Sequence, residues 1–101
     1  MPTNTTVLFR GAATTTVGTT LYTVPSGRTT VVSNIAVTNT ASTAATFTLA
    51  LAGTAIHTTA AIAANSTAYI DLKQVLAASN TITGGASATS VNFHISGIEV
   101  F

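Results

Sequence analysis

The sequence predicts an all-β protein, built as a single antiparallel β-sandwich that is jelly-roll-like. Short runs rich in β-branched and aromatic residues alternate apolar with polar side chains, which is the period-two pattern of half-buried strands. Turn residues separate these runs at intervals of roughly 8 to 12 residues, a spacing typical of sandwiches. The length of 101 residues fits one domain with one modest core.

The strand candidates follow one another from residue 21 to the end of the chain. Pro25–Arg28 predicts a turn after the first of them, because proline presets φ and a glycine supplies a flexible position. The segment 46–51 shows the strictest alternation. Lys73–Ser79 is the only segment where we expect a helical turn, and it has too few apolar residues for a longer helix. The candidate strands are residues 21–24, 29–40, 46–51, 55–59, 60–64, 68–72, 80–83 and 90–101.

The last candidate strand contains an irregularity. Its apolar residues up to Ile95 share one face, whereas Ile98 and Val100 have the opposite parity. A slip of one residue would turn these two side chains towards solvent. We therefore expect a β-bulge at Ser96–Gly97 that returns them to the core, since glycine tolerates the backbone of a bulge.

Residues 1–16 differ from the rest because they are polar and Thr-rich, with one dense apolar group at residues 7–9. They are predicted to form an extended N-terminal arm or a first edge strand, and residues 17–101 the sandwich domain. An apolar triplet in a polar arm needs a pocket to bury it. Deletion of residues 1–11 should then leave the sandwich folded. The candidate anchor to a neighbouring subunit consists of Val7, Leu8, Phe9 and Arg10.

The chain is nearly uncharged. Charged residues make up 5 % of it, against about 25 % in typical soluble domains. The net charge of +1 provides no field that would attract nucleic acid and no polybasic patch for a membrane surface. The absence of cysteine excludes disulfides and Cys-based zinc sites. The charged residues are Arg10, Arg28, Asp71, Lys73 and Glu99.

Groups that perform chemistry are too few and too scattered to predict an active site. Asp71 and Glu99 could form a catalytic carboxylate pair, but each is expected to be an isolated surface charge. His57 and His94 lie far apart in the sequence and lack metal-ligand spacing, and no nucleophile elbow or phosphate-binding motif is present. Sugar binding usually relies on exposed aromatic residues, and the chain has no Trp and two Tyr. We therefore predict no enzyme activity, no catalytic or metal-binding residues and no cofactor.

Several motifs resemble those of small β-sandwich virion structural proteins from tailed bacteriophages. They are the segment VPSGRTTVVSNI at residues 24–35, Asn39, AATFTL at 44–49, IAANST at 62–67, and VNFHISGIEV at 91–100. The resemblance covers about residues 20–101 and consists of turns and strands, without functional side chains.

This resemblance implies a repeated subunit on the exterior of a virion, made in the host cytoplasm. Its first implication is a capsid decoration (cement) protein, commonly a homotrimer, whose partner is the major capsid protein and which stabilises the head by bridging capsid subunits. Neither nucleic acid nor a membrane would be a partner. The first alternative is a tail or fibre module for assembly or host attachment, and the second is a carbohydrate-binding sandwich.

Overall fold

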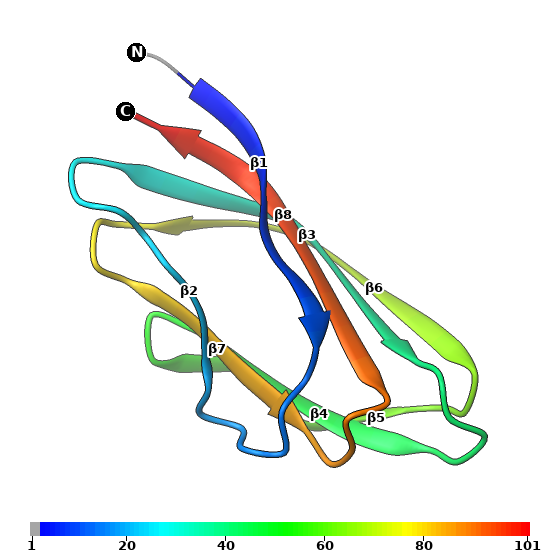
Figure 1. Cartoon of the computed structure of the whole chain (residues 1–101). Coiled ribbons are helices and arrows are strands. Elements are labelled where there is room, and N and C mark those ends of the chain that lie inside the picture. Colours follow the sequence, from blue (N-terminus) through cyan, green and yellow to red (C-terminus); the bar gives the residue numbers. More distant parts are fainter. Residues whose placement is uncertain (1–2) are drawn as a thin grey trace.

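Eight antiparallel strands form two sheets in the computed structural model, which describes residues 3–101 (Figure 1). The all-β class is therefore confirmed. Among the described residues, no helix is long and apolar enough to cross a membrane. The strands are β1 (Thr3–Ala12), β2 (Thr20–Thr23), β3 (Thr29–Asn39), β4 (Ala45–Leu51), β5 (Thr54–Ile62), β6 (Ser66–Leu76), β7 (Thr81–Ala86) and β8 (Val91–Val100).

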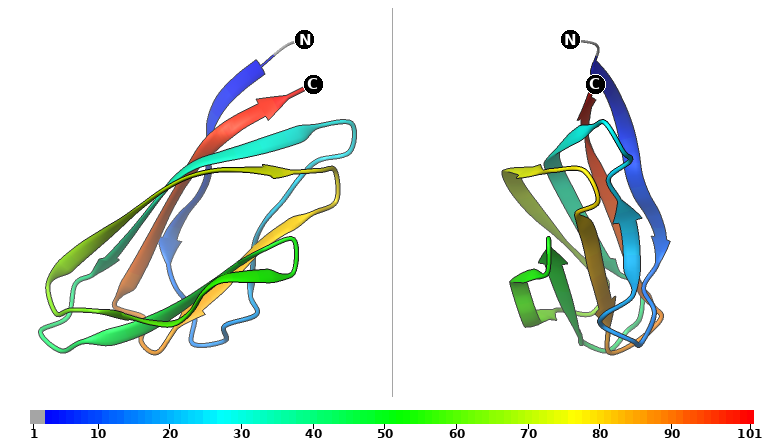
Figure 2. Two further views of the ribbon diagram at one scale, coloured as in Figure 1. Left: turned by 180° about the vertical axis from the view of Figure 1, so that it is seen from behind. Right: turned by 90° about the vertical axis from the view of Figure 1, so that its left-hand side faces the viewer.

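The strand order is that of a jelly roll. Sheet A has the order β1-β8-β3-β6 and sheet B has the order β2-β7-β4-β5. The first half of the chain thus pairs with the second half in reverse order: β1 with β8, β2 with β7, β3 with β6, and β4 with β5. A long antiparallel ribbon that folds over once gives this arrangement, and the two layers are visible in Figure 2.

One hydrophobic core lies between the sheets. Side chains alternate between buried and half-buried along β4, so that Phe47, Leu49 and Leu51 point inward as the sequence predicts. Phe47 of sheet B meets Phe93 of sheet A edge to face, with ring centroids 6.3 Å apart. This contact packs one sheet against the other in the edge-to-face arrangement that aromatic pairs favour.

The helical turn expected at Lys73–Ser79 is absent, and β6 continues to Leu76. Val31 and Val32 of β3 lie opposite Val75 and Gln74, so pairing with β3 satisfies this backbone. A helical nucleus fixes several dihedral angles for one hydrogen bond, whereas extending an existing ladder adds bonds to a neighbour already in place. Tertiary pairing therefore overrides the weak local preference.

The bulge expected at Ser96–Gly97 is also absent from β8, whose side chains alternate regularly from Val91 to Val100. The irregularities lie in the neighbouring strands instead, at Leu8 of β1 and at Ser33 of β3. Ile98 and Val100 therefore point to the outer face of sheet A and are half-buried there.

Gly97 explains why β8 can keep its regular alternation, without the bulge that the sequence predicts. A Cβ atom on this glycine would lie 2.4 Å from the carbonyl oxygen of Val31 and 3.0 Å from Cδ1 of Leu8. The side chain of Leu8 fills the space that a residue at position 97 would otherwise occupy. Because β1 supplies this apolar group, β8 can place glycine on the inner face without leaving a cavity.

Residues 3–16 belong to the sandwich, and of the two alternatives for this segment the structure has the edge strand. The segment from Thr3 to Ala12 pairs with β8 along its whole length. The following residues cross to sheet B, where the backbone oxygens of Thr14 and Thr19 accept hydrogen bonds from β7. No structural boundary separates residues 3–16 from the rest, and the first two residues of the predicted arm lie outside the described part of the chain.

The turn predicted at Pro25–Arg28 is present, and non-glycine residues adopt a positive φ in other turns, at Ala52, Asn65 and Ser79. Gly27 has a φ of 77° in the turn after Pro25. In the β4–β5 hairpin, Ala52 (φ 52°) and Gly53 (φ 80°) both lie in the left-handed region. This is the type I′ geometry that two-residue hairpins favour, and its first position prefers Asn. An alanine there carries a steric cost that Asn reduces.

We therefore expect Ala52→Asn to raise the free energy of unfolding by about 0.5–1 kcal/mol. The measurement is urea unfolding followed by circular dichroism, and the control is the same change at Ala61, an exposed strand position on β5. Equal changes in stability at the two positions would show that the gain does not come from the backbone conformation of the turn.

Candidate functional site

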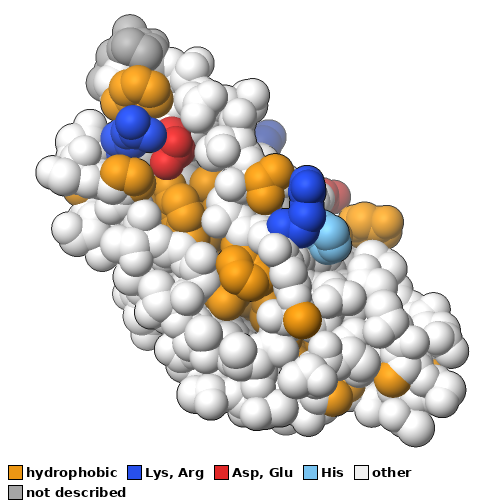
Figure 3. All heavy atoms as spheres, in the orientation of Figure 1, with side chains coloured by type: hydrophobic (Ala, Val, Ile, Leu, Met, Phe, Trp, Pro, Cys, Tyr) orange, Lys and Arg blue, Asp and Glu red, His pale blue; other side chains and the backbone are white. Residues whose placement is uncertain are grey.

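The outer face of sheet A, which points away from the core, is formed by the four strands β1, β8, β3 and β6. Cross-strand pairs arrange its side chains in rows that run from β1 through β8 and β3 to β6. One row is aliphatic over three strands and consists of Thr5, Ile98, Val31 and Val75. Val7, which is 47 % exposed, extends this apolar area on β1. On the side of the molecule that Figure 3 shows, orange side chains lie in small separate groups on a mostly white surface.

Further rows of the same face are polar and contain the titratable groups. One row places Arg10 beside His94, followed by Ala36 and Tyr69. Asp71 of β6 lies in another row, where its carboxylate accepts a hydrogen bond from the Asn34 amide at 3.3 Å. All of these groups are solvent-accessible to some degree.

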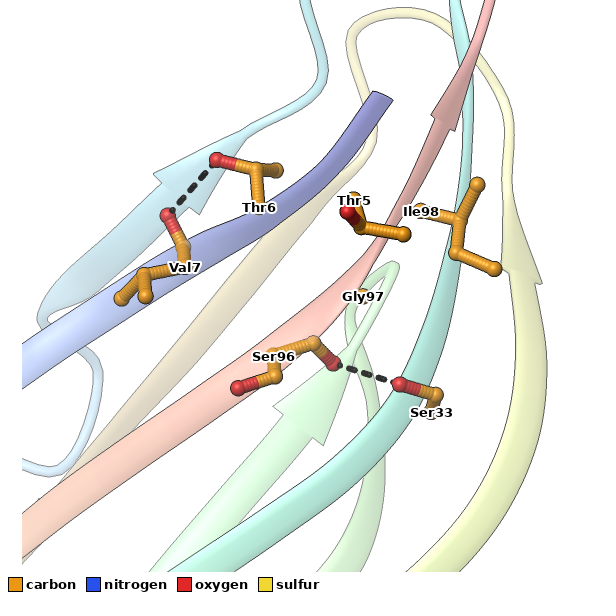
Figure 4. A pocket seen from close by; sticks show the side chains of 7 residues that line it. All are labelled: Thr5, Thr6, Val7, Ser33, Ser96, Gly97 and Ile98. Atoms are coloured by element: carbon orange, nitrogen blue, oxygen red, sulfur yellow. Dashed lines mark hydrogen bonds between the residues drawn. The ribbon is translucent and has the colours of Figure 1, made fainter. Parts of the chain in front are cut away.

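Two open hollows meet at Ser33, where β3 bulges. The first, about 440 Å³, is lined by Thr5, Thr6, Val7, Ser33, Ser96, Gly97 and Ile98 (Figure 4). The Ser33 hydroxyl donates a hydrogen bond of 3.2 Å to the Ser96 backbone oxygen. The second hollow, about 480 Å³, is lined by Ser33, Asp71, Leu72 and Lys73. Hydroxyls and aliphatic groups dominate the first hollow, so it offers a ligand shape complementarity and weak hydrogen bonds.

The predicted anchor residues do not act together as an exposed apolar knob. Leu8 is 7 % exposed and belongs to the core, and Phe9 packs against that core. Val7 and Arg10 remain exposed on β1. Deletion of residues 1–11 would remove core side chains and most of an edge strand, so the expectation that the sandwich survives this deletion does not hold. The reason is that Leu8 and Phe9 find their pocket within their own domain.

The remaining titratable residues are dispersed. His57 lies on β5 of sheet B, with its ring 5.4 Å from that of Phe47, whereas His94 is exposed on the outer face of sheet A. Asp71 is exposed on β6. Within residues 3–101, no group of three or more potential metal-ligating side chains comes together.

Glu99 is the exception among the charged residues, because it is buried at 6 % exposure. The Tyr22 hydroxyl donates a hydrogen bond of 2.6 Å to Glu99 Oε2, and Arg28 Nη1 lies 3.0 Å from Oε1. Thr30 lies 3.0 Å from the Tyr22 hydroxyl oxygen, and the Arg28 guanidinium lies 4.2 Å from the centroid of the Phe101 ring. This network joins both sheets near the C-terminus, so the expectation that Glu99 is an isolated surface charge is wrong.

Two features in the sequence could have located this network. Glu99 shares the parity of Phe93 and Ile95, so a regular β8 places it inward. Arg28 follows a turn that brings it to the start of β3, and Thr29 pairs with Val100. The predicted bulge hid the first feature, because it reversed the parity of every residue after Gly97.

The network perturbs the pKa values of both acids that it contains. The hydrogen bond from Tyr22 holds the pKa of the Glu99 carboxyl below its ordinary value of 4.5, and the charge of Arg28 acts in the same direction. Burial raises the pKa of Tyr22 above 10.0, with the Glu99 hydrogen bond as the next cause. Because the folded-state pKa of Glu99 is lowered, its stabilising effect is present above pH 4.5 and is lost as pH falls through the lowered value.

We expect Tyr22→Phe to cost about 1–2 kcal/mol of unfolding free energy at pH 7, because it removes a hydrogen bond to a buried carboxylate. The cost should shrink as pH falls below 4.5 and Glu99 becomes protonated in the unfolded and then in the folded state. The measurement is urea unfolding at pH 7 and pH 3. The control is Tyr69→Phe, because the side chain of Tyr69 is 73 % exposed. A loss of stability of the same size at both pH values would contradict a hydrogen bond from Tyr22 to an ionised Glu99.

Asn39 forms a second buried polar centre, at the end of β3, with no exposed surface. Its amide nitrogen donates to the backbone oxygens of Thr43 at 2.8 Å and Ala63 at 3.4 Å. Its amide oxygen accepts from the Ala41 backbone N–H and from the Ser90 hydroxyl, both at 3.1 Å. The sequence singled out Asn39 as part of a motif but did not show that its side chain connects three loops.

Comparison with known proteins does not assign the chain to a family. No protein-family model matches the chain, and no curated protein is significantly similar to it. Its function is therefore inferred from the jelly-roll fold, the composition of the outer face and the motifs of the sequence.

Proposed function

We propose that this chain is a structural subunit of a tailed-phage particle, and more specifically a capsid decoration (cement) protein that bridges capsid subunits. The observation that carries the proposal is the outer face of sheet A, where aliphatic and hydroxyl side chains predominate. Its charged side chains are Arg10, Asp71 and Lys73, to which His94 adds a titratable group. Cores of protein interfaces are depleted in charged residues, because burying a charge against a partner is costly.

The fold supports a role in assembly. Jelly rolls occur in viral capsid proteins as well as in lectins and cupins. This is support by analogy of fold, and the resemblance of the motifs to phage virion proteins adds to it. The molecule is also elongated, with extents of 45 × 21 × 18 Å. A rod-like module of this length can contact two neighbouring subunits at once.

The first test is the copy number in purified particles of the phage that encodes the chain, measured by quantitative mass spectrometry. A decoration protein should be present in hundreds of copies. Tens of copies or fewer would favour the tail or fibre alternative instead. Absence from the particle, or specific binding of the isolated protein on a glycan array, would contradict a purely structural virion role.

The second test asks whether the outer face makes the contact. Particles lacking the protein are incubated with purified wild-type chain or with one of two matched variants, and occupancy is measured. Thr5→Asp adds one negative charge to the outer face of sheet A, and Thr58→Asp adds the same charge to exposed β5 of sheet B. We expect Thr5→Asp to lower occupancy and Thr58→Asp to leave it unchanged. Equal occupancy by both variants would exclude the outer face as the contact.

A further inference from the structure

We propose that the free edge of β6 is a self-pairing surface, at which a second copy of this chain adds its own β6 in antiparallel orientation. The two copies of sheet A then form one continuous sheet around a two-fold axis at Leu72. This inference does not depend on a virion role, since it concerns the isolated protein.

The first observation is that β6 is an edge strand with unpaired backbone groups. It ends the order β1-β8-β3-β6, and Figure 2 shows it at the margin of its sheet. It spans Ser66–Leu76 and is among the longest strands of the fold. Proteins usually protect long edges from pairing, because such an edge is a template for another strand. Residues 66–76 contain neither proline nor glycine, and their charges are of both signs.

The second observation is the order of the exposed side chains on β6. Tyr69, Asp71, Lys73 and Val75 point to the outer face in succession, and all are exposed. Tyr69 and Val75 are 73 % and 67 % exposed, the highest values among the exposed large apolar side chains of the described residues. Two apolar groups therefore flank two opposite charges, with Leu72 at the centre of the series.

This order is complementary to itself. In an antiparallel pair with the two Leu72 residues opposite each other, Asp71 lies opposite Lys73 of the second copy, and the reverse pair forms by symmetry. Tyr69 likewise lies opposite Val75 of the second copy, which covers both exposed apolar side chains. Opposite charges and aromatic–aliphatic neighbours are favourable cross-strand pairs. The two-fold axis repeats each pair, as an isologous interface requires.

The charges also select the register. Moving the axis by one residue to Asp71 places the two Asp71 carboxylates opposite each other, and moving it to Lys73 does the same for the ammonium groups. Like charges directly opposite are destabilising.

The contact fits the distribution of charge in the chain. Asp71 and Lys73 are two of its five charged residues, and Lys73 has no ion-pair partner among the described residues. A second copy supplies that partner.

The test is sedimentation velocity of the purified full chain over a concentration series into the high-micromolar range. We expect a monomer–dimer equilibrium for the wild type. Lys73→Asp places like charges opposite each other twice and should weaken dimerisation by about tenfold or more. Arg10→Asp is the matched control, because it makes the same change of charge on β1, the opposite edge of sheet A. It should leave dimerisation unchanged.

A charge exchange and a cross-link make the test specific. The double variant Asp71→Lys, Lys73→Asp restores opposite charges at both positions, so it should dimerise as the wild type does. The chain has no cysteine, and Leu72→Cys places a single thiol on the axis. We expect this variant to form a disulfide-linked dimer on mild oxidation. Tyr69→Cys should not, because its copies would be separated by six residues along the strands, roughly 20 Å.

Three results would overturn the proposal. One is a wild-type chain that stays monomeric over the whole concentration series. Another is a dimer, or the trimer that the motif resemblance implies, whose stability is equally affected by Lys73→Asp and Arg10→Asp. The third is cross-linking of Tyr69→Cys as efficient as that of Leu72→Cys. If Lys73→Asp does not fold, the comparison of the two cysteine variants decides.

Discussion

Replacing Asn39 with alanine will lower the free energy of unfolding by about 3 kcal/mol or more. The side chain is fully buried and its amide takes part in four hydrogen bonds. Truncation removes the partner of two backbone carbonyl oxygens, one backbone N–H and the Ser90 hydroxyl. These groups lie beside a fully buried side chain, where water has little access. Each unsatisfied buried group costs about 1–3 kcal/mol, reduced where water can enter beside the loops.

The measurement is urea unfolding followed by circular dichroism at pH 7. The matched control is Asn92→Ala, because Asn92 is a half-buried residue on the outer face of β8. That substitution should change stability by less than about 0.5 kcal/mol. Hydrogen exchange gives a second measurement: the Ala41 amide should lose its protection in Asn39→Ala. Equal losses of stability in the two variants would show that Asn39 is not a clamp between the loops.

Gly97→Ala should have the second large effect, a loss of about 3 kcal/mol or a chain that does not fold. The added methyl group would lie 2.4 Å from the carbonyl oxygen of Val31. That oxygen is backbone, and β3 is paired on both sides, with β8 and with β6. The strand cannot move away without distorting two ladders, so the strain is not relieved by a change of rotamer.

Gly18→Ala is the matched control, because nothing lies within 4 Å of a Cβ atom at that position. It should be neutral or slightly stabilising, through the smaller entropy of the unfolded chain. Adding Leu8→Ala to Gly97→Ala removes the second contact but leaves the Val31 carbonyl in place, so it should not restore stability. A Gly97→Ala variant as stable as Gly18→Ala would mean that β8 bulges at this point after all.

The strands and turns that local sequence determines could be predicted. The alternation around Phe47 arises from burial of one face, and the turn at Gly27 requires a backbone that glycine adopts freely. The class of fold then follows from the number of strands and their spacing. Each of these features depends on residues that are close together in the chain, which is why periodicity and turn chemistry are sufficient.

Features set by pairing partners could not be predicted in this way. The parity of Ile98 depends on bulges at Leu8 and Ser33, which lie in other strands. Residues 3–12 look like an arm because their alternation is weak, yet pairing with β8 satisfies their backbone. Burial of Glu99 follows from the same long-range register. The sequence of one strand does not show which neighbouring strand will pair with its polar residues or fill the space beside its glycine.

The pairing of β1 with β8 has a mechanical consequence. Thr3 lies opposite Val100, so both ends of the described chain leave the sandwich at the same end of one ladder (Figure 1). A force that pulls the two ends apart acts on one pair of residues at a time and opens the ladder like a zipper. A force applied across the faces of the sandwich meets the packed core as a whole. The molecule should therefore withstand lateral load and yield readily to tension between its termini.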